Sequence, residues 1–172
     1  MEWQAIRRGM VAGLIATIAL SVVMMLQSVS GVMPDVNVTA ILGEIANEIA
    51  GLPDTSVVGW FLHGIVGVVI GGGFFAIAYA YFPGPTAVVR GMVYAVMVWL
   101  LMMVAIMPMG DLGFFGMEVS GTVPVVMLVL QLLFGAILGF SYEKLTRQNK
   151  GLQYPRARPK ANAFASMDVK NF

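Results

Sequence analysis

The fold is decided by residues 60–81, which read WFLHGIVGVVIGGGFFAIAYAY. This stretch has no charged residue and is long enough for a helix of about 20 residues to cross a bilayer. It holds the single histidine of the chain, His63, followed at steps of four by Gly67 and Gly71. Residues four apart share one face of an α-helix. We therefore interpret the stretch as a membrane-spanning helix with a polar, glycine-lined face.

The composition of the whole chain is typical of a membrane protein. Of its 172 residues, 59% are hydrophobic and 11% are charged, whereas a soluble domain carries about 25% charged residues. Uncharged apolar blocks occupy residues 9–29, 57–82, 91–109 and 122–142. Backbone in lipid must hydrogen bond within its own segment, which favours helices. We predict an all-α membrane protein with four transmembrane helices in residues 1–149, followed by an extended basic cytoplasmic tail, residues 150–172.

Two sequence echoes indicate an internal duplication. Residues 8–11 and 90–93 both read RGMV. The last apolar block repeats the spacing of His63, Gly67 and Gly71, with a polar residue and two glycines at steps of four: Gln131, Gly135 and Gly139. We interpret the chain as a tandem duplicated hairpin whose two units have the same orientation, with a symmetry axis along the membrane normal. The glycines are predicted to pack helices two and four together.

The loop after the first apolar block is predicted to contain a short amphipathic helix. Asn37 is a suitable N-cap, Ala50 the expected end, and Gly51 a suitable stop signal. Its apolar residues share one face: Val38, Ile41, Leu42, Ile45 and Ile49. We expect this helix to lie along the membrane surface or to cap the bundle, with docking of a partner as the alternative. In the second such loop, residues 107–122, Phe114 and Phe115 are expected to enter the interface or plug the bundle.

The basic residues are distributed unevenly. All ten Lys and Arg residues lie before the first block, between the second and third, or after the fourth. The positive-inside rule then places both termini in the cytoplasm. We expect contacts with anionic lipid or with a partner from five of them: Arg8, Arg90, Arg156, Arg158 and Lys160. A net charge of +1 argues against a nucleic-acid partner.

His63 is the candidate for chemistry inside the membrane. Polar side chains in a bilayer usually face other protein groups, so a hydrogen bond to Gln131 is the structural interpretation. The functional alternative is a haem or chlorin ligand. A metal site of its own is not expected, because the chain offers no second histidine and no cysteine. No set of catalytic residues is recognisable, so an enzyme is not expected, and the 14 methionines are interpreted as packing residues.

Several motifs recur in a fixed order along the chain. They are RGMVAGLIAT at 8–17, VGWFLH at 58–63, WLLMM at 99–103, MP at 107–108, GFFG at 113–116, and the closing Gly135, Gly139 and Tyr142. In this order the chain resembles a family of small four-helix bacterial membrane proteins of uncharacterised function. The resemblance covers about residues 5–145. It implies a bacterial inner-membrane protein and supplies no activity.

Three functions are compatible with these features. The first is a non-catalytic accessory or assembly subunit of a larger membrane complex, such as an energy-transducing one (respiratory or photosynthetic). The lipid bilayer and other membrane subunits, held partly through the tail, would be its partners. The second is a small channel or carrier for an uncharged or lipidic substrate. The third is haem or pigment binding through His63.

Overall fold

In the computed structural model, residues 2–30 and 37–153 are described, and the regular structure within them is entirely helical. Four helical stretches are long and apolar enough to cross a membrane: Trp3–Gln27, Ser56–Ala78, Ala87–Met109 and Val123–Arg147. The predicted all-α fold with four spans is therefore confirmed. Residues 154–172, and with them Arg156, Arg158 and Lys160, lie outside the described part of the chain.

Two of the spans are single helices and two are composite. The first span is α1 (Glu2–Ser30) and the fourth is α7 (Val123–Gln153). The second span joins α3 (Ser56–Ile65), the π-helix η1 (Val66–Phe74) and α4 (Phe75–Ala78). The third joins α5 (Ala87–Leu101), the π-helix η2 (Met102–Ile106) and α6 (Met107–Met109). Because α7 continues to Gln153, the helical part extends past the predicted boundary at residue 149.

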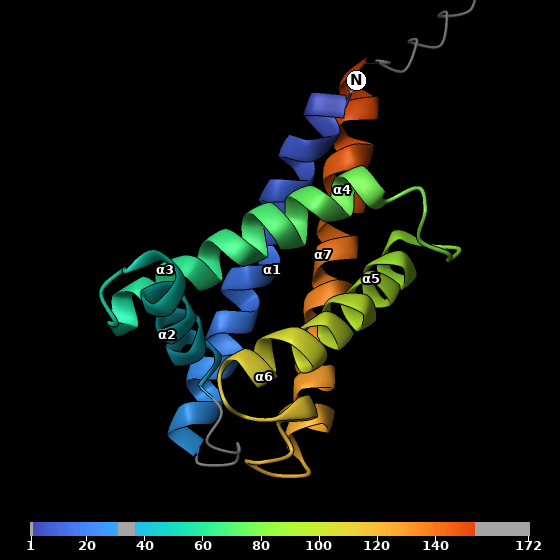
Figure 1. The fold of residues 1–172 in the computed structure, drawn as a ribbon. Helices are drawn as coiled ribbons and strands as arrows, with labels where there is room; N and C mark the ends of the chain where they lie inside the picture. Colours follow the sequence, from blue (N-terminus) through green and yellow to red (C-terminus); the bar gives the residue numbers. More distant parts are fainter. Residues whose placement is uncertain (1, 31–36, 154–172) are drawn as a thin grey trace, which may run out of the picture.

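The first and fourth spans form the centre of the bundle. Helices α1 and α7 pack against each other, the second span packs on α1, and the third packs on α7 (Figure 1). The second and third spans are joined by the turn at residues 79–86 and diverge from it (Figure 1). We call the end of the bundle with the N-terminus the termini side, and the end with α2 (Val38–Ala50) the loop side.

Each hairpin is held by close contact between glycines. In the first hairpin, a Cβ atom placed on Gly13 would lie 2.7 Å from the Cα of Gly72. In the second, a Cβ on Gly135 would lie 2.8 Å from the carbonyl carbon of Gly91. No side chain fits at either contact, so the backbones touch, as small residues allow in membrane helices. Gly9 faces Gly72 just as Gly91 faces Gly135, so the two hairpins are packed in the same way.

The prediction that helices two and four meet through their glycines is wrong. Gly67 faces Thr17 of α1, and Gly139 faces Ala87 of α5. Gly71 does approach α7, but it is covered there by the Phe134 ring, whose Cζ lies 2.8 Å from a Cβ placed on Gly71. The echo missed Gly72 because η1 is a π-helix, whose hydrogen bonds run to the fifth residue instead of the fourth. Gly67 and Gly72, which are five residues apart, both lie against Gly13 of α1.

The amphipathic helix of the first loop is confirmed as α2. The side chain of Asn37 accepts a hydrogen bond of 3.2 Å from the backbone N–H of Ala40, and Gly51 ends the helix with a φ of 63°. Ile41 is buried, whereas Ile49, at the far end of the apolar face, is 72% exposed. A Cβ on Gly59 of α3 would overlap the carbonyl of Thr39, so α2 lies directly on the second span.

Aromatic side chains fill the bundle on the termini side of its middle. Their ring centroids lie 5.1 Å apart for Tyr79 and Tyr142, and 5.4 Å apart for Phe75 and Tyr94. Phe82 stacks on Phe75 at 6.2 Å. Rings of this size dominate packing energetics when buried. We call these five residues the aromatic cluster, and it joins the second, third and fourth spans.

The second loop also packs on the bundle. Phe115 lies with its ring 5.8 Å from that of Trp99, whose indole N–H donates a 3.1 Å hydrogen bond to the carbonyl of Pro124. Phe114, by contrast, is 65% exposed. Of the two phenylalanines expected to contact the bundle or the interface, Phe115 contacts the bundle and Phe114 points outward.

Candidate functional site

All four spans and α2 line one cavity of about 260 Å³. Its walls are Thr17 and Leu20 of α1, the π-helical part of the second span, Val98 and Met102 of the third span, and Met127 and Gln131 of α7. Val38 and Leu42 of α2 close it on the loop side. Among the described residues, the lining is apolar except for Thr17, His63 and Gln131, and it contains no charged side chain.

The cavity lies in the half of the bundle nearer to the loop side. His63 comes seven residues after Ser56, the first residue of the second span, and Gln131 eight residues after Val123, the first of α7. At 1.5 Å per residue, the two polar side chains are about 10–12 Å along their helices. Toward the termini side the cavity ends at Phe134, and the aromatic cluster fills the bundle beyond it. The cavity is therefore closed in that direction.

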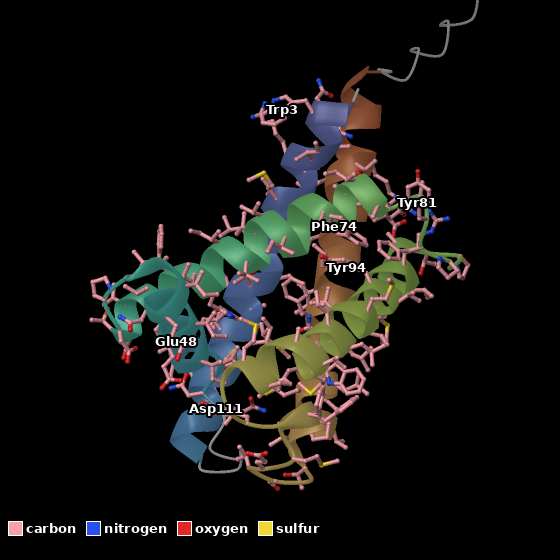
Figure 2. The ribbon with its side chains drawn as sticks, viewed as in Figure 1. Trp3, Glu48, Phe74, Tyr81, Tyr94 and Asp111 are labelled. Atoms are coloured by element: carbon pink, nitrogen blue, oxygen red, sulfur yellow. The ribbon has the colours of Figure 1, made fainter. Side chains whose placement is uncertain are left out.

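Between the second and third spans the cavity opens sideways. We call this opening the mouth and define its rim by Val66, Ile70 and Leu101, which line the cavity and are 37%, 52% and 65% exposed. Figure 1 shows the two spans diverging at this place, and Figure 2 shows Phe74 and Tyr94 where they approach each other again. Because the rim is apolar and lies within the spans, the mouth faces lipid in a membrane.

The three polar side chains of the cavity differ in whether they have a hydrogen-bond partner within the protein. The Thr17 hydroxyl donates a 2.8 Å hydrogen bond to the carbonyl of Gly13, so it is already satisfied. The Nε2 atom of His63 is buried and has no hydrogen-bond partner. Gln131 makes no hydrogen bond with any described residue. The predicted bond between His63 and Gln131 is therefore wrong, although both side chains line the same cavity.

An unpaired ring nitrogen in this position is costly. A buried polar group without a hydrogen bond loses about 1–3 kcal/mol, and buried side-chain atoms of this kind are rare. The remaining neighbour of the imidazole is the Trp60 ring, whose centroid lies 5.9 Å away at a near-perpendicular angle of 83°. That contact orients the His63 ring but does not satisfy Nε2. Because protein atoms cover this nitrogen, a molecule in the cavity reaches it only when the His63 ring turns.

Both spans beside the mouth include a π-helical segment that contributes to the cavity lining. Ile70 and Gly71 belong to η1, and Met102 and Ile106 belong to η2. π-Helical segments are rare in proteins and are found frequently at functional sites. Their occurrence on both sides of one opening marks this cavity as the candidate functional site.

A second, smaller hollow lies on the loop side, outside the spans. It has a volume of about 220 Å³ and is lined by Glu44, Glu48, Asp54 and Asp111. Figure 2 shows Glu48 and Asp111 on this side of the molecule. Within the described ranges, no group of three or more His, Cys, Asp or Glu residues is arranged to hold a metal ion.

Arg8 and Arg90, the basic residues at the start of the first and third spans, make different hydrogen bonds. The Arg90 side chain donates to the carbonyls of Gly84 at 3.1 Å and Tyr79 at 3.4 Å, and its guanidinium lies 4.8 Å from the Tyr79 ring centroid. Arg90 therefore ties the turn between the second and third spans together. Arg8 donates to the side chain of Gln4 at 3.2 Å.

Residues 3–153 match the family of unknown function DUF6789. The chain belongs to this family. The match ends at Gln153, the last residue that the structure describes, so it covers all four spans. The sequence-based resemblance to an uncharacterised family is thereby confirmed. No curated protein matches the chain, and no solved structure matches it either.

Two of the three polar residues of this DUF6789 cavity, His63 and Gln131, were predictable from the sequence, whereas Thr17 and the apolar wall were not. His63 and Gln131 were recognisable because polar residues are scarce inside membrane spans. Val98, Leu101 and Met127 gave no signal, because an apolar side chain can face lipid, the bundle core or a cavity without any change in the pattern. The α-helical spacing that ought to reveal a shared face is interrupted in η1 and η2.

Proposed function

We propose that this protein binds a small, uncharged, lipid-soluble molecule inside the membrane. The observation that supports this most directly is the cavity at which all four spans meet, with the side chains of His63 and Gln131 among its lining. Pockets for small molecules are typically apolar with a few well-placed polar groups, and this cavity has that character. A small channel or carrier for an uncharged or lipidic substrate is the second of the sequence-based hypotheses.

The chemistry of the wall favours an uncharged ligand. No Asp, Glu, Lys or Arg in the described part of the chain lines the cavity, so a charged molecule would find no counter-ion there. Placing an unpaired charge in such surroundings is strongly unfavourable. Two side chains without partners, His63 and Gln131, can instead hydrogen bond to a neutral polar group.

The closed end of the cavity favours binding over conduction. A channel needs a continuous path, whereas here Phe134 and the aromatic cluster occupy the termini side of the bundle. Transfer across the membrane would require these rings to move. We therefore propose a binding protein that exchanges its ligand with the surrounding lipid.

The accessory-subunit hypothesis has less support from the structure than from the sequence alone. It rested partly on glycine faces available for a partner, yet Gly13, Gly72, Gly91 and Gly135 are used inside the hairpins. It also rested on the tail, and residues 154–172 lie outside the described part of the chain. Stoichiometric membrane subunits that co-purify with the full chain, and are lost on truncation after Lys150, would restore it to first place.

Haem or chlorin binding through His63 is also less well supported. The cavity volume of about 260 Å³ lies below the range of about 300–1,000 Å³ that is typical of pockets for drug-sized ligands. A large macrocycle would have to displace the cavity wall or lie across the mouth. A colourless purified protein would exclude this proposal, and visible absorption lost in His63→Ala would support it.

We further propose that the protein resides in a bacterial inner membrane with both termini in the cytoplasm. The positive-inside rule supports this orientation, because Arg7, Arg8 and Arg90 begin spans on the termini side, whereas Glu44 and Asp111 belong to the loop side. In that orientation the cavity and its mouth lie in the outer half of the bilayer.

Ligand binding can be tested by native mass spectrometry of the gently solubilised full-length protein. We expect an adduct of defined mass on the wild type. Val98→Phe, which places a larger side chain in the cavity, should remove the adduct. Met97→Phe is the matched control, because the neighbouring Met97 is 57% exposed and does not line the cavity.

The result that would overturn the proposal is equally direct. A wild-type protein that carries no small molecule, even after incubation with a total lipid extract, does not bind one in this cavity. An adduct that survives equally in Val98→Phe and Met97→Phe lies elsewhere on the protein, and the cavity would lose its proposed role.

A further inference from the structure

From the shape of the cavity and its polar groups, we infer that the ligand is an elongated lipid with a carbonyl group at its buried end. The inference rests on the proposed function. In this arrangement the molecule enters sideways from the bilayer through the mouth. Its carbonyl meets His63 and Gln131, while its apolar chain extends outward between Ile70 and Leu101.

The volume of the cavity indicates that it holds only one end of the ligand. At about 260 Å³, it is smaller than pockets that enclose a drug-sized molecule, which begin at about 300 Å³. A lipid chain is longer than such a molecule, so most of it must lie outside. The mouth provides the exit, because its rim residues Ile70 and Leu101 line the cavity and are also more than half exposed.

The mouth has fixed limits on both sides. On the termini side, the Tyr94 hydroxyl donates a 2.8 Å hydrogen bond to the Ile70 carbonyl and thereby joins the second and third spans. On the loop side, Ile41 of α2 packs on the end of the third span, with its Cγ2 2.8 Å from a Cβ placed on Gly110. Entry from either aqueous side is obstructed, so the bilayer is the source of the ligand.

The two unpaired side chains indicate the chemistry of the buried end. The Gln131 amide has two N–H donors, and the imidazole of His63, once the ring turns toward the cavity, donates from Nε2 in one of its two neutral tautomers. A carbonyl oxygen has two lone pairs and can accept from both groups at once. A purely hydrocarbon end would leave Nε2 unsatisfied. The third polar side chain, Thr17, needs no ligand because it is bonded to Gly13.

The carbonyl can belong to a lipid quinone or to an acyl ester, and three probes of similar chain length separate these sources. They are decylbenzoquinone, methyl decanoate and decylbenzene, of which the last has the ring and chain of the first without its carbonyls. Each probe is titrated into full-length protein in lipid nanodiscs, and native mass spectrometry gives the bound fraction against the mole fraction of probe in lipid.

We expect at least one carbonyl probe to bind more tightly than decylbenzene, by about 2- to 12-fold for each hydrogen bond gained. This gain should disappear in His63→Phe and in Gln131→Leu, which keep the approximate size of each side chain. Thr17→Val should retain it. A greater gain for decylbenzoquinone would identify a quinone as the natural class, and a greater gain for methyl decanoate would identify an acyl lipid.

Sideways entry is tested by a pair of neighbouring substitutions in η1. Ile70→Trp places a large ring at the rim and should weaken all three probes by tenfold or more. Val69→Trp adds the same ring at a residue with similar exposure, 49% against 52%, that does not line the cavity. It should leave binding unchanged. Equal effects of the two substitutions would overturn entry through the mouth.

Failure of this inference is distinguishable from failure of the proposed function. If decylbenzene binds the wild type as tightly as both carbonyl probes, the carbonyl assignment is overturned while ligand binding stands. The same conclusion follows if the carbonyl gain survives in Gln131→Leu, which serves as the second test should His63→Phe not fold. If none of the probes binds and no native adduct is found, the proposed function itself fails.

Discussion

The hydroxyl of Tyr94 in α5 donates a hydrogen bond of 2.8 Å to the backbone carbonyl oxygen of Ile70 in η1. This bond joins two spans that otherwise diverge, and it marks the point at which the lateral opening ends. The equivalent pair in the duplicated arrangement, α1 and α7, packs together directly. The cavity therefore lies where the internal symmetry of the two hairpins is broken.

Tyr94→Phe should loosen this junction without disturbing the ring packing around it. We expect the free energy of unfolding to fall by about 0.6 kcal/mol, the average for hydrogen bonds between membrane helices. Tyr142→Phe is the matched control, since Tyr142 belongs to the same aromatic cluster but its hydroxyl makes no hydrogen bond with a described residue. Unfolding in mixed micelles of increasing denaturing-detergent content measures both. Equal losses would show that the hydroxyl of Tyr94 does not hold the spans together.

The glycine contacts within the hairpins predict that Gly→Ala substitutions change the free energy of unfolding by different amounts, according to the space around each glycine. Gly135→Ala places a Cβ against the backbone of Gly91, and Gly91→Ala does the reverse, so each should lower the free energy of unfolding by about 1–3 kcal/mol. Gly64 in α3 has nothing within 4 Å of its Cβ position. Gly64→Ala should therefore be neutral or stabilising by up to about 1 kcal/mol. The same unfolding assay ranks the three variants, and a Gly64→Ala loss as large as the others would contradict this packing.

The number of spans, their pairing into two hairpins and the position of α2 followed from the sequence, whereas the contact between the two hairpins did not. Span length is set by the bilayer, and the ends of α2 are set by local groups, Asn37 and Gly51, that act within one turn. The predicted contact between the hairpins depended on which glycine faces which. The echo of Gly67 with Gly135 assumed a regular α-helix, but in the structure it is Gly72 that takes the place equivalent to Gly135.

Arg90 provides a test of how the turn between the second and third spans is held. Its guanidinium reaches the carbonyls of Gly84 and Tyr79 from one planar group, which an ammonium cannot reproduce. Arg90→Lys should therefore raise amide hydrogen exchange across residues 79–86. Arg147→Lys is the control, because Arg147 is exposed and pairs with Glu143 one turn away, an arrangement that contributes little. Unchanged exchange in Arg90→Lys would mean that the turn is held by its own backbone.

The candidate site was predictable only in its polar part. His63 and Gln131 could be selected from the sequence because few other residues within the apolar blocks carry hydrogen-bonding side chains. The relationship between the two side chains could not be predicted. A direct hydrogen bond between them and a cavity that both of them line would have the same residues at the same positions in the sequence. The difference depends on how far the second and third spans diverge, and that is fixed by contacts remote in sequence, such as the one between Tyr94 and Ile70.

The orientation of the protein can be tested with single cysteines, because the chain has none of its own. Asp54 lies on the loop side, and Tyr81, which is 86% exposed, lies in the turn on the termini side (Figure 2). In intact bacterial cells with a permeable outer membrane, Asp54→Cys should react with a membrane-impermeant maleimide. Tyr81→Cys should react only after the inner membrane is opened. The reverse pattern would place the termini outside and the lateral mouth in the inner leaflet, and labelling of both cysteines in intact cells would contradict the single span, Ser56–Ala78, that separates them.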